Sequence, residues 1–275
     1  MDFNTADDKA RRFKELHAAP GVFITPNPWD AGSALALAHL GYPALATSSA
    51  NAAMVLGRKD GQITRDESIA HAKALVEAVD IPVAADLENG FGATPADCAE
   101  TIRRAIAIHL AGGSIEDSTG DAANPIFDFN HAVERIAAAA EVAHAGPHAF
   151  MLTARCENFL NGRADLDDTI RRLQAFAAAG ADVLFAPGLP DLESVRAVCA
   201  AVGKPVNFMV GIKGKSFSVA ELEAARVKRI SLATSLYRAA MTGLIDAARE
   251  AKDKGTFGYL DRSLSTPDVN AFMQG

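Results

Sequence analysis

The sequence is poor in cysteine and in aromatic residues. Its 275 residues include three cysteines and one tryptophan, and aromatic side chains make up 7% of the chain. Cys98, Cys156 and Cys199 form no C-x-x-C pair and no zinc-ligand spacing. We therefore expect reduced thiols in a cytoplasmic protein rather than a disulfide framework or a zinc site.

Long apolar runs and clusters of basic residues are also missing. No apolar run reaches the roughly 18 residues that a membrane helix needs, and the N-terminus is acidic and then helical in pattern. We therefore expect no membrane span and no secretory signal. The 27 basic residues are outnumbered by 34 acidic ones, and they form no basic stretch. This balance makes a nucleic-acid partner unexpected.

Short apolar runs alternate with alanine-rich amphipathic stretches along nearly the whole chain. Strand-like runs separated by helical patterns predict βαβ units, and continuously apolar strands suit a parallel sheet that is covered on both faces. Eight such units predict an α/β fold of the (β/α)8 TIM-barrel type, with residues 1–275 as one domain. The predicted strands lie in the runs GVFIT (21–25), PALATSS (43–49), PVAADLE (82–88), GGSIED (112–117), HAFMLTAR (148–155), ADVLFAP (181–187), KPVNFM (204–209) and RISLA (229–233).

Polar residues gather at the C-terminal ends of these runs, where a parallel barrel places its active site. Asp86 and Glu88 end the third run, Glu116 lies near the end of the fourth and Arg155 ends the fifth, while Asn207 lies in the seventh. Asp86 and Glu88 are two positions apart, so on a strand they would point to the same face. This one-sided distribution predicts an enzyme.

The carboxylates of this set, without a histidine or cysteine cluster, form an oxygen-rich site. Oxygen ligands suit a hard divalent cation, so we predict Mg²⁺, or alternatively Mn²⁺, at Asp86, Glu88 and Glu116. The cation would also offset the repulsion among the carboxylates. Arg155 offers a planar fork for a substrate carboxylate. A metal beside such a fork favours a small 2-oxo acid as substrate, with an enolate that the metal stabilises.

Six stretches of the chain match one known family in order and spacing. They are TPNPWDAGSALALAHLGYPALATSSA (25–50), LGRKDG (56–61), AADLENGFG (84–92), SIEDS (114–118), TARCENF (153–159) and KRISLA (228–233). In these stretches the chain resembles the isocitrate lyase/phosphoenolpyruvate mutase superfamily. The resemblance implies a barrel with a C-terminal helix exchanged between subunits, a homodimer or homotetramer, and Mg²⁺-dependent chemistry on 2-oxo acids or dicarboxylates. We expect the weakly periodic tail, residues 255–275, to pack on a neighbouring subunit.

The resemblance also implies roles for individual residues at the metal. Asp86 corresponds to the direct metal ligand, and Glu88 and Glu116 would act mainly through metal-bound water. The family usually has aspartate where this chain has Glu88, so the water network is expected to be shifted here.

Other residues correspond to the substrate-binding and catalytic positions of the family. Ser48, Ser49 and Ala50 would bind the substrate carboxylate, with Arg155 opposite. Asp60 resembles a loop aspartate that lies near the reacting group. The predicted catalytic set is therefore Asp60, Arg155 and Glu116, and the predicted substrate contacts are Ser48, Ser49, Ala50, Asp86, Arg155, Asn124 and Asn207.

The loop after the fourth run, STGDAANP (118–125), departs from the family. It lacks the Lys-(Lys/Arg)-Cys-Gly-His run of isocitrate and methylisocitrate lyases, whose cysteine is the catalytic acid. It also lacks the lysines of the phosphonopyruvate enzymes, although Asn124 stands for their asparagine. The preferred function is therefore C–C bond cleavage in a small 2-oxo acid by a lyase, decarboxylase or hydrolase. The alternatives are a phosphonopyruvate mutase or hydrolase, and a non-catalytic oxo-acid-binding protein.

Overall fold

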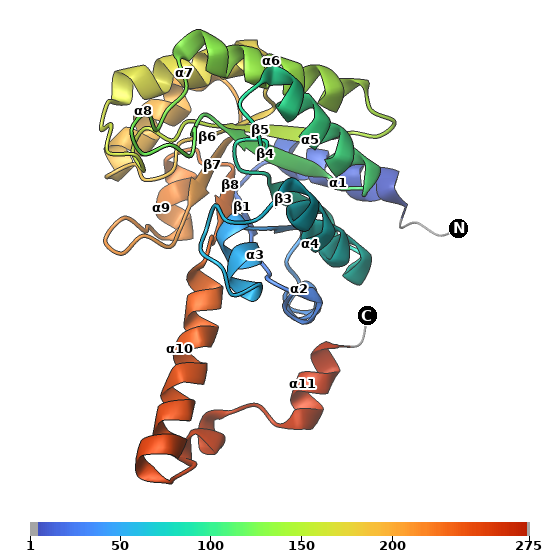
Figure 1. Cartoon of the computed structure of the whole chain (residues 1–275), viewed down its shortest axis with the longest axis vertical. Coiled ribbons are helices and arrows are strands. Elements are labelled where there is room, and N and C mark those ends of the chain that lie inside the picture. The colour runs from blue at the N-terminus through green and yellow to red at the C-terminus, as the bar shows by residue number, and fades with distance from the viewer. Residues whose placement is uncertain (1–4, 274–275) are drawn as a thin grey trace.

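Eight parallel strands form a nearly closed barrel in the computed structural model, which describes residues 5–273 (Figure 1). Their order is β1-β8-β7-β6-β5-β4-β3-β2, and Ala46 N donates to Pro26 O at 3.1 Å across the seam. Each strand falls inside one of the eight predicted runs, so the predicted (β/α)8 barrel is confirmed. The strands are β1 (Phe23–Thr25), β2 (Leu45–Ala46), β3 (Val83–Asp86), β4 (Gly112–Glu116), β5 (Met151–Arg155), β6 (Val183–Phe185), β7 (Val206–Met209) and β8 (Arg229–Ser231).

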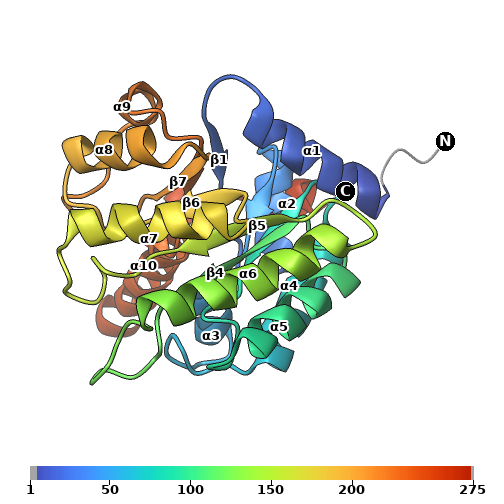
Figure 2. The same cartoon turned by 90° about the horizontal axis from the view of Figure 1, so that it is seen from above.

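Helices surround the strands, and α4 to α8 follow one another around the barrel when it is seen from above (Figure 2). Within residues 5–273, none of the helices has the length and apolar character that crossing a bilayer requires. The helices up to the last strand are α1 (Ala6–Ala18), α2 (Ala31–His39), α3 (Ser49–Val55), α4 (Arg65–Ala78), α5 (Pro95–Ala107), α6 (Phe129–Ala145), α7 (Leu166–Ala178), α8 (Leu192–Val202) and α9 (Val219–Ala224).

Local sequence signals fix where these helices begin. At α5 the Thr94 hydroxyl accepts from Asp97 N at 3.3 Å, and the Asp97 carboxylate accepts from Thr94 N at 2.9 Å. This reciprocal capping satisfies two N–H groups that would otherwise lack partners. Pro95 suits the first helical position because proline has no backbone N–H that would need a partner there. The same Ser/Thr-x-x-Asp/Glu capping box starts α1, α4 and α9.

Helix α1 closes the N-terminal end of the barrel. Its Phe13 is fully buried and packs in a cluster formed by the first residues of several strands, among them Phe23, Met151 and Val183. One turn further along, His17 is also buried and packs edge-on against Phe13 and Phe23. The barrel is therefore sealed at this end.

The protonation state of His17 follows from its two ring contacts. Nδ1 lies 2.8 Å from Phe13 O, and a carbonyl only accepts, so Nδ1 carries the proton. Nε2 is then the acceptor that faces Arg229 Nη1 at 3.4 Å. Burial, together with the adjacent Arg229 cation, lowers the pKa of His17 to about 3.

We expect His17 to make folding stability depend on pH. The unfolded chain takes up a proton at His17 near its ordinary pKa of 6.5, whereas the folded protein does not until about pH 3. Stability from this residue is therefore present above about pH 6.5 and is lost as the pH falls. Between pH 7.5 and 5 the wild type should lose about 2 kcal/mol more unfolding free energy than His17→Gln. Urea unfolding of both proteins at the two pH values measures this difference, and equal losses would contradict it.

The C-terminal segment leaves the barrel as a projecting arm (Figure 1). Helix α10 (Ser235–Arg249) has no buried residue within the described chain and continues into a π-helical turn (Glu250–Lys254) and a 3-10 turn (Gly258–Arg262). Helix α11 (Thr266–Phe272) then returns toward α2, where the rings of Phe272 and His39 lie 5.1 Å apart. Seven of the twelve exposed large apolar side chains of residues 5–273 lie on this arm: Leu244, Ile245, Phe257, Leu260, Leu264, Val269 and Met273.

Candidate active site

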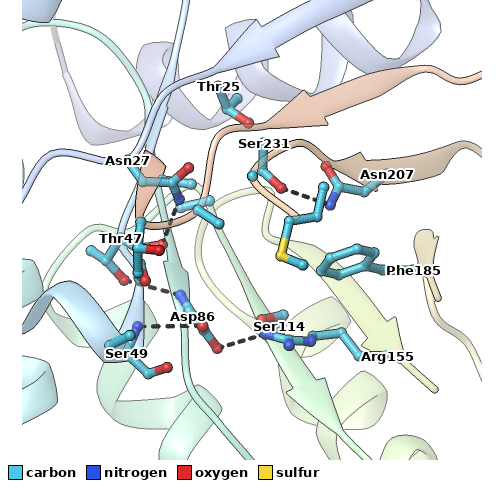
Figure 3. A pocket seen from close by; sticks show the side chains of 18 of the residues that line it. Thr25, Asn27, Thr47, Ser49, Asp86, Ser114, Arg155, Phe185, Asn207 and Ser231 are labelled. Carbon is cyan, nitrogen blue, oxygen red and sulfur yellow. Dashed lines mark hydrogen bonds and ion pairs between the residues drawn. The ribbon is translucent and has the colours of Figure 1, made fainter. Parts of the chain in front are cut away.

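A cavity of about 360 Å³ lies at the C-terminal ends of the strands and extends down into the barrel (Figure 3). Polar side chains from most strands line it, as the sequence predicted for an active site at this end. Seven of the predicted site residues line this cavity: Ser48, Ser49, Ala50, Asp60, Asp86, Arg155 and Asn207.

Asp86 is the last residue of β3 and the most connected carboxylate of the cavity. Its Oδ1 accepts from Arg155 Nη1 at 3.0 Å and from Glu88 N at 3.2 Å, and its Oδ2 accepts from Ser49 N at 3.3 Å (Figure 3). The Asp86 N–H donates to the Thr47 hydroxyl at 3.0 Å. The carboxylate is thereby fixed in orientation from three neighbouring segments of the chain.

Glu88 does not continue the strand, because β3 ends at Asp86 and Glu88 has a φ of +49°. The expectation that Asp86 and Glu88 share a strand face is therefore wrong: Leu87 is fully buried and the chain turns at Glu88. A glutamate in the left-handed region is strained, and such strain often accompanies function. The Glu88 Oε1 atom is buried without a hydrogen-bond partner in the described residues. Burial, reinforced by Asp86 and Asp60, raises the pKa of Glu88 to about 7.

Arg155 is the cation that joins the carboxylates of neighbouring strands. Its guanidinium lies 3.0 Å from Asp86, 3.4 Å from Glu116 and 2.9 Å from Glu157, and it stacks over the Phe185 ring at 5.0 Å. Burial works against its charge, but the three carboxylates outweigh burial and hold the pKa of Arg155 well above its ordinary value. The fork predicted for a substrate carboxylate is thus occupied by the carboxylates of the protein itself.

Three carboxylates pair with this single guanidinium and a fourth, Glu88, lies close enough to feel its charge, so the site is short of positive charge. Burial raises the pKa of Glu116 well above its ordinary value and also raises that of Glu157, although Arg155 opposes both shifts. A second cation would relieve this shortage. The oxygen donors and the unpartnered Oε1 of Glu88 fit Mg²⁺ or Mn²⁺.

The geometry suits one direct protein ligand rather than a protein cage. Among residues 5–273, no three histidine, cysteine or acidic side chains converge as ligands of one ion. Mg²⁺ usually keeps several waters and takes only one or two carboxylates. Glu88 and Glu116 do not line the cavity, so they suit contacts through water rather than direct ligation.

Two predicted residues lie in loops at the mouth of the barrel. The Ser49 hydroxyl donates to Asp60 Oδ1 at 2.9 Å, which ties the exposed Asp60 loop to the start of α3. Asn124 lies in an exposed turn held by its neighbours Asp121 and Thr119, and it does not line the cavity. The structure therefore brings Asp60, but not Asn124, to the other site residues.

Several cavity or site residues were not predicted. Asn27 donates from Nδ2 to Thr47 O at 2.9 Å and accepts from Leu232 N at 2.9 Å, which links β1, β2 and β8 at the seam. Its position just after the first apolar run is a signal that could have revealed it. Glu157 carries the same signal, since it follows the end of the fifth run by two residues, but no site role was predicted for it. Arg229, at the start of β8, has no such signal.

The family of the chain follows from its match to a protein-family model. The model of the family described as phosphoenolpyruvate phosphomutase matches residues 13–252. The chain belongs to this family. The resemblance seen in the sequence is therefore confirmed.

Several known proteins are similar to the chain over most of its length. A solved structure of a candidate lyase/mutase from Burkholderia cenocepacia J2315 is 49% identical, with a TM-score of 0.96 over 98% of this chain and 97% of that one. The 2,3-dimethylmalate lyase of Eubacterium barkeri is 26% identical over 96% of this chain and 93% of its own. The 2-methylisocitrate lyase of Escherichia coli is 30% identical over 76% and 73%.

We expect Arg155→Gln to destabilise the fold by about 3–5 kcal/mol at pH 8, because it leaves buried carboxylates without their cation. The loss should be smaller at pH 5, where carboxyl groups of raised pKa take up protons. The control Arg171→Gln removes an arginine that is 68% exposed and pairs with Asp168 at 2.6 Å, and it should cost less than about 1 kcal/mol. Urea unfolding at both pH values measures these losses, and equal losses in the two variants would contradict the prediction.

Proposed function

We propose that the protein is a Mg²⁺-dependent enzyme that cleaves a C–C bond of a small 2-oxo acid or a related carboxylate. The observation that carries this proposal is the surplus of carboxylates over cations beside a cavity of about 360 Å³. The two named lyases among its relatives support the same class of reaction.

Asp86 would hold the metal directly, with Glu88 and Glu116 holding water molecules around it. When bound there, Mg²⁺ would draw electron density from the keto and carboxylate oxygens of the substrate and so lower the energy of an enolate. The hydrogen bond from Ser49 N to Asp86 Oδ2 keeps that carboxylate turned toward the cavity. Positioning of this kind is part of what makes such a site effective.

The other cavity residues would bind the substrate and exclude water. Ser48 offers its hydroxyl group to the substrate carboxylate, and Leu160, Phe185 and Met209 add an apolar wall. Asp60, whose carboxylate accepts from the Ser49 hydroxyl, would donate or accept a proton at the group that leaves C3 of the substrate.

We expect Asp86→Asn to lower Mg²⁺ affinity and to reduce kcat/KM on 2-oxo acids by at least about 100-fold, because the direct ligand loses its charge. The matched control Asp167→Asn removes a charge from the exposed first turn of α7 and should change neither quantity. Calorimetric titration with Mg²⁺ and turnover on a panel of 2-oxo acids measure the effect. Unchanged affinity and turnover in Asp86→Asn would refute the proposal.

A second candidate is C–P chemistry on phosphonopyruvate, which the name of the matching family favours. The loop at 118–125 has no lysine to hold a phosphonate. Phosphorus NMR after incubation with phosphonopyruvate decides between the candidates, and the absence of any new signal would remove this one. Tight binding of oxo acids without turnover would instead favour a non-catalytic binding protein.

We also propose that the arm formed by residues 235–273 packs on a second copy of the chain in a homodimer or homotetramer. Leu260 and Leu264 are 61% and 64% exposed, and such exposure of neighbouring apolar residues is typical of an interface. Substituting both by serine should shift the assembly toward a monomer in light scattering. The control Val219→Ser removes an apolar side chain that is 44% exposed on α9 and should leave the mass unchanged. A wild-type monomer would refute the proposal.

A further inference from the structure

Arg229 is a buried cation whose described partners are all neutral. It is 7% exposed and lines the lower part of the cavity. Its Nε donates to Asn207 Oδ1 at 2.9 Å, its Nη2 donates to Thr153 Oγ1 at 3.0 Å, and its Nη1 faces the neutral His17 at 3.4 Å. Among residues 5–273 no carboxylate lies within ion-pair distance of it, whereas Arg155 in the same cavity has three.

The charge of Arg229 persists although it is unfavourable there. Burial lowers the pKa of Arg229 to about 10, which still leaves the guanidinium charged at neutral pH. A buried ion without a counter-ion is costly, and proteins rarely retain one unless it has a function. The floor of the cavity therefore carries a permanent positive charge that no described carboxylate neutralises.

The donors at this floor are only partly used. A guanidinium has five N–H groups, and three of those of Arg229 have described partners. The bond to Asn207 Oδ1 turns the Asn207 amino group toward the Ser231 hydroxyl at 3.2 Å (Figure 3). Arg229, Asn207 and Ser231 lie on the adjacent strands β7 and β8, so their polar groups face one part of the cavity.

Small residues on the opposite strands leave room for a ligand above this floor. Ala46, Ala84 and Gly113 line the cavity from β2, β3 and β4. Barrel interiors are usually filled by bulky side chains at these levels. Here the space remains open and leads from Asp86 at the mouth toward Arg229 below.

We propose that Arg229, Asn207 and Ser231 form an anion subsite that binds the far carboxylate of a dicarboxylic oxo acid. The near carboxylate and keto group of this ligand would lie at the Asp86 end, and a cavity of about 360 Å³ is within the usual range for small-molecule sites. The identity of the ligand as an oxo acid rests on the proposed function. The anion subsite itself rests on the uncompensated charge of Arg229.

The test compares two oxo acids that differ in one carboxylate, 2-oxoglutarate and 2-oxobutyrate, by calorimetric binding to the full-length protein with Mg²⁺. Arg229→Met should weaken 2-oxoglutarate binding by about 30-fold or more, because a buried charge partner is lost. Binding of 2-oxobutyrate should change by less than about two-fold. The control Arg196→Met removes an exposed arginine of α8 and should leave both affinities unchanged.

A second variant and a stability measurement distinguish a loss of ligand binding from a loss of folding. Asn207→Asp retains the guanidinium but places a carboxylate 2.9 Å from it, so it should also weaken 2-oxoglutarate selectively. Thermal unfolding without ligand should show Arg229→Met to be at least as stable as the wild type, since an unpaired buried charge is removed. Lowered stability with unchanged affinity for both acids would show that Arg229 is structural and overturn the subsite.

Failure of the subsite and failure of the proposed function give different results. If the wild type binds neither oxo acid in the presence of Mg²⁺, the proposed function is wrong. Inorganic phosphate in EDTA then tests the subsite alone. Binding to the wild type but not to Arg229→Met supports the subsite, and equal or absent binding refutes it.

Discussion

The ion pairs of Arg155 are the interaction on which the site depends. Four carboxylates converge where β3, β4 and β5 end, and like charges at such distances cannot all stay ionised without a cation. The strand register fixes this meeting point, because it sets Glu116 of β4 beside Arg155 of β5 and Asp86 of β3 beside Ser114 of β4. Because side chains alternate along a strand, a shift of one residue would turn these groups away from the cavity. Strand register and electrostatics therefore specify the same arrangement.

The two ends of the barrel are packed differently: side chains fill the N-terminal end and leave the C-terminal end open. At the N-terminal end Phe13 of α1 fills the space between the first residues of the strands, so water is excluded there. At the other end alanine and glycine on β2 to β4 leave the interior open, and polar side chains on β7 and β8 face the opening. Arg229 lies at the boundary, with His17 on one side and the cavity on the other.

Local patterns in the sequence were sufficient to predict the strands and the polar residues that end them. They were not sufficient at Glu88, since strand alternation does not reveal that the chain turns into the left-handed region one residue after the buried Leu87. Nor could they place Asn124, whose turn is fixed by its own hydrogen bonds with Thr119 and Asp121. The burial of Arg229 depends on α1, which is about 210 residues away in the chain. A basic residue at the start of a strand gives no sign of such long-range packing.

The two arginines of the cavity differ in a way that couples metal and ligand under the proposed function. Arg155 is saturated by carboxylates of the protein, so by itself it attracts an anion weakly. A divalent cation held by Asp86 would compete with Arg155 for the same carboxylate and so would free part of the guanidinium for a ligand. Such coupling is reciprocal, since a ligand that occupies Arg155 also makes Asp86 available to the metal. Arg229 does not need a metal ion to make its charge available to a ligand, because its described partners are neutral.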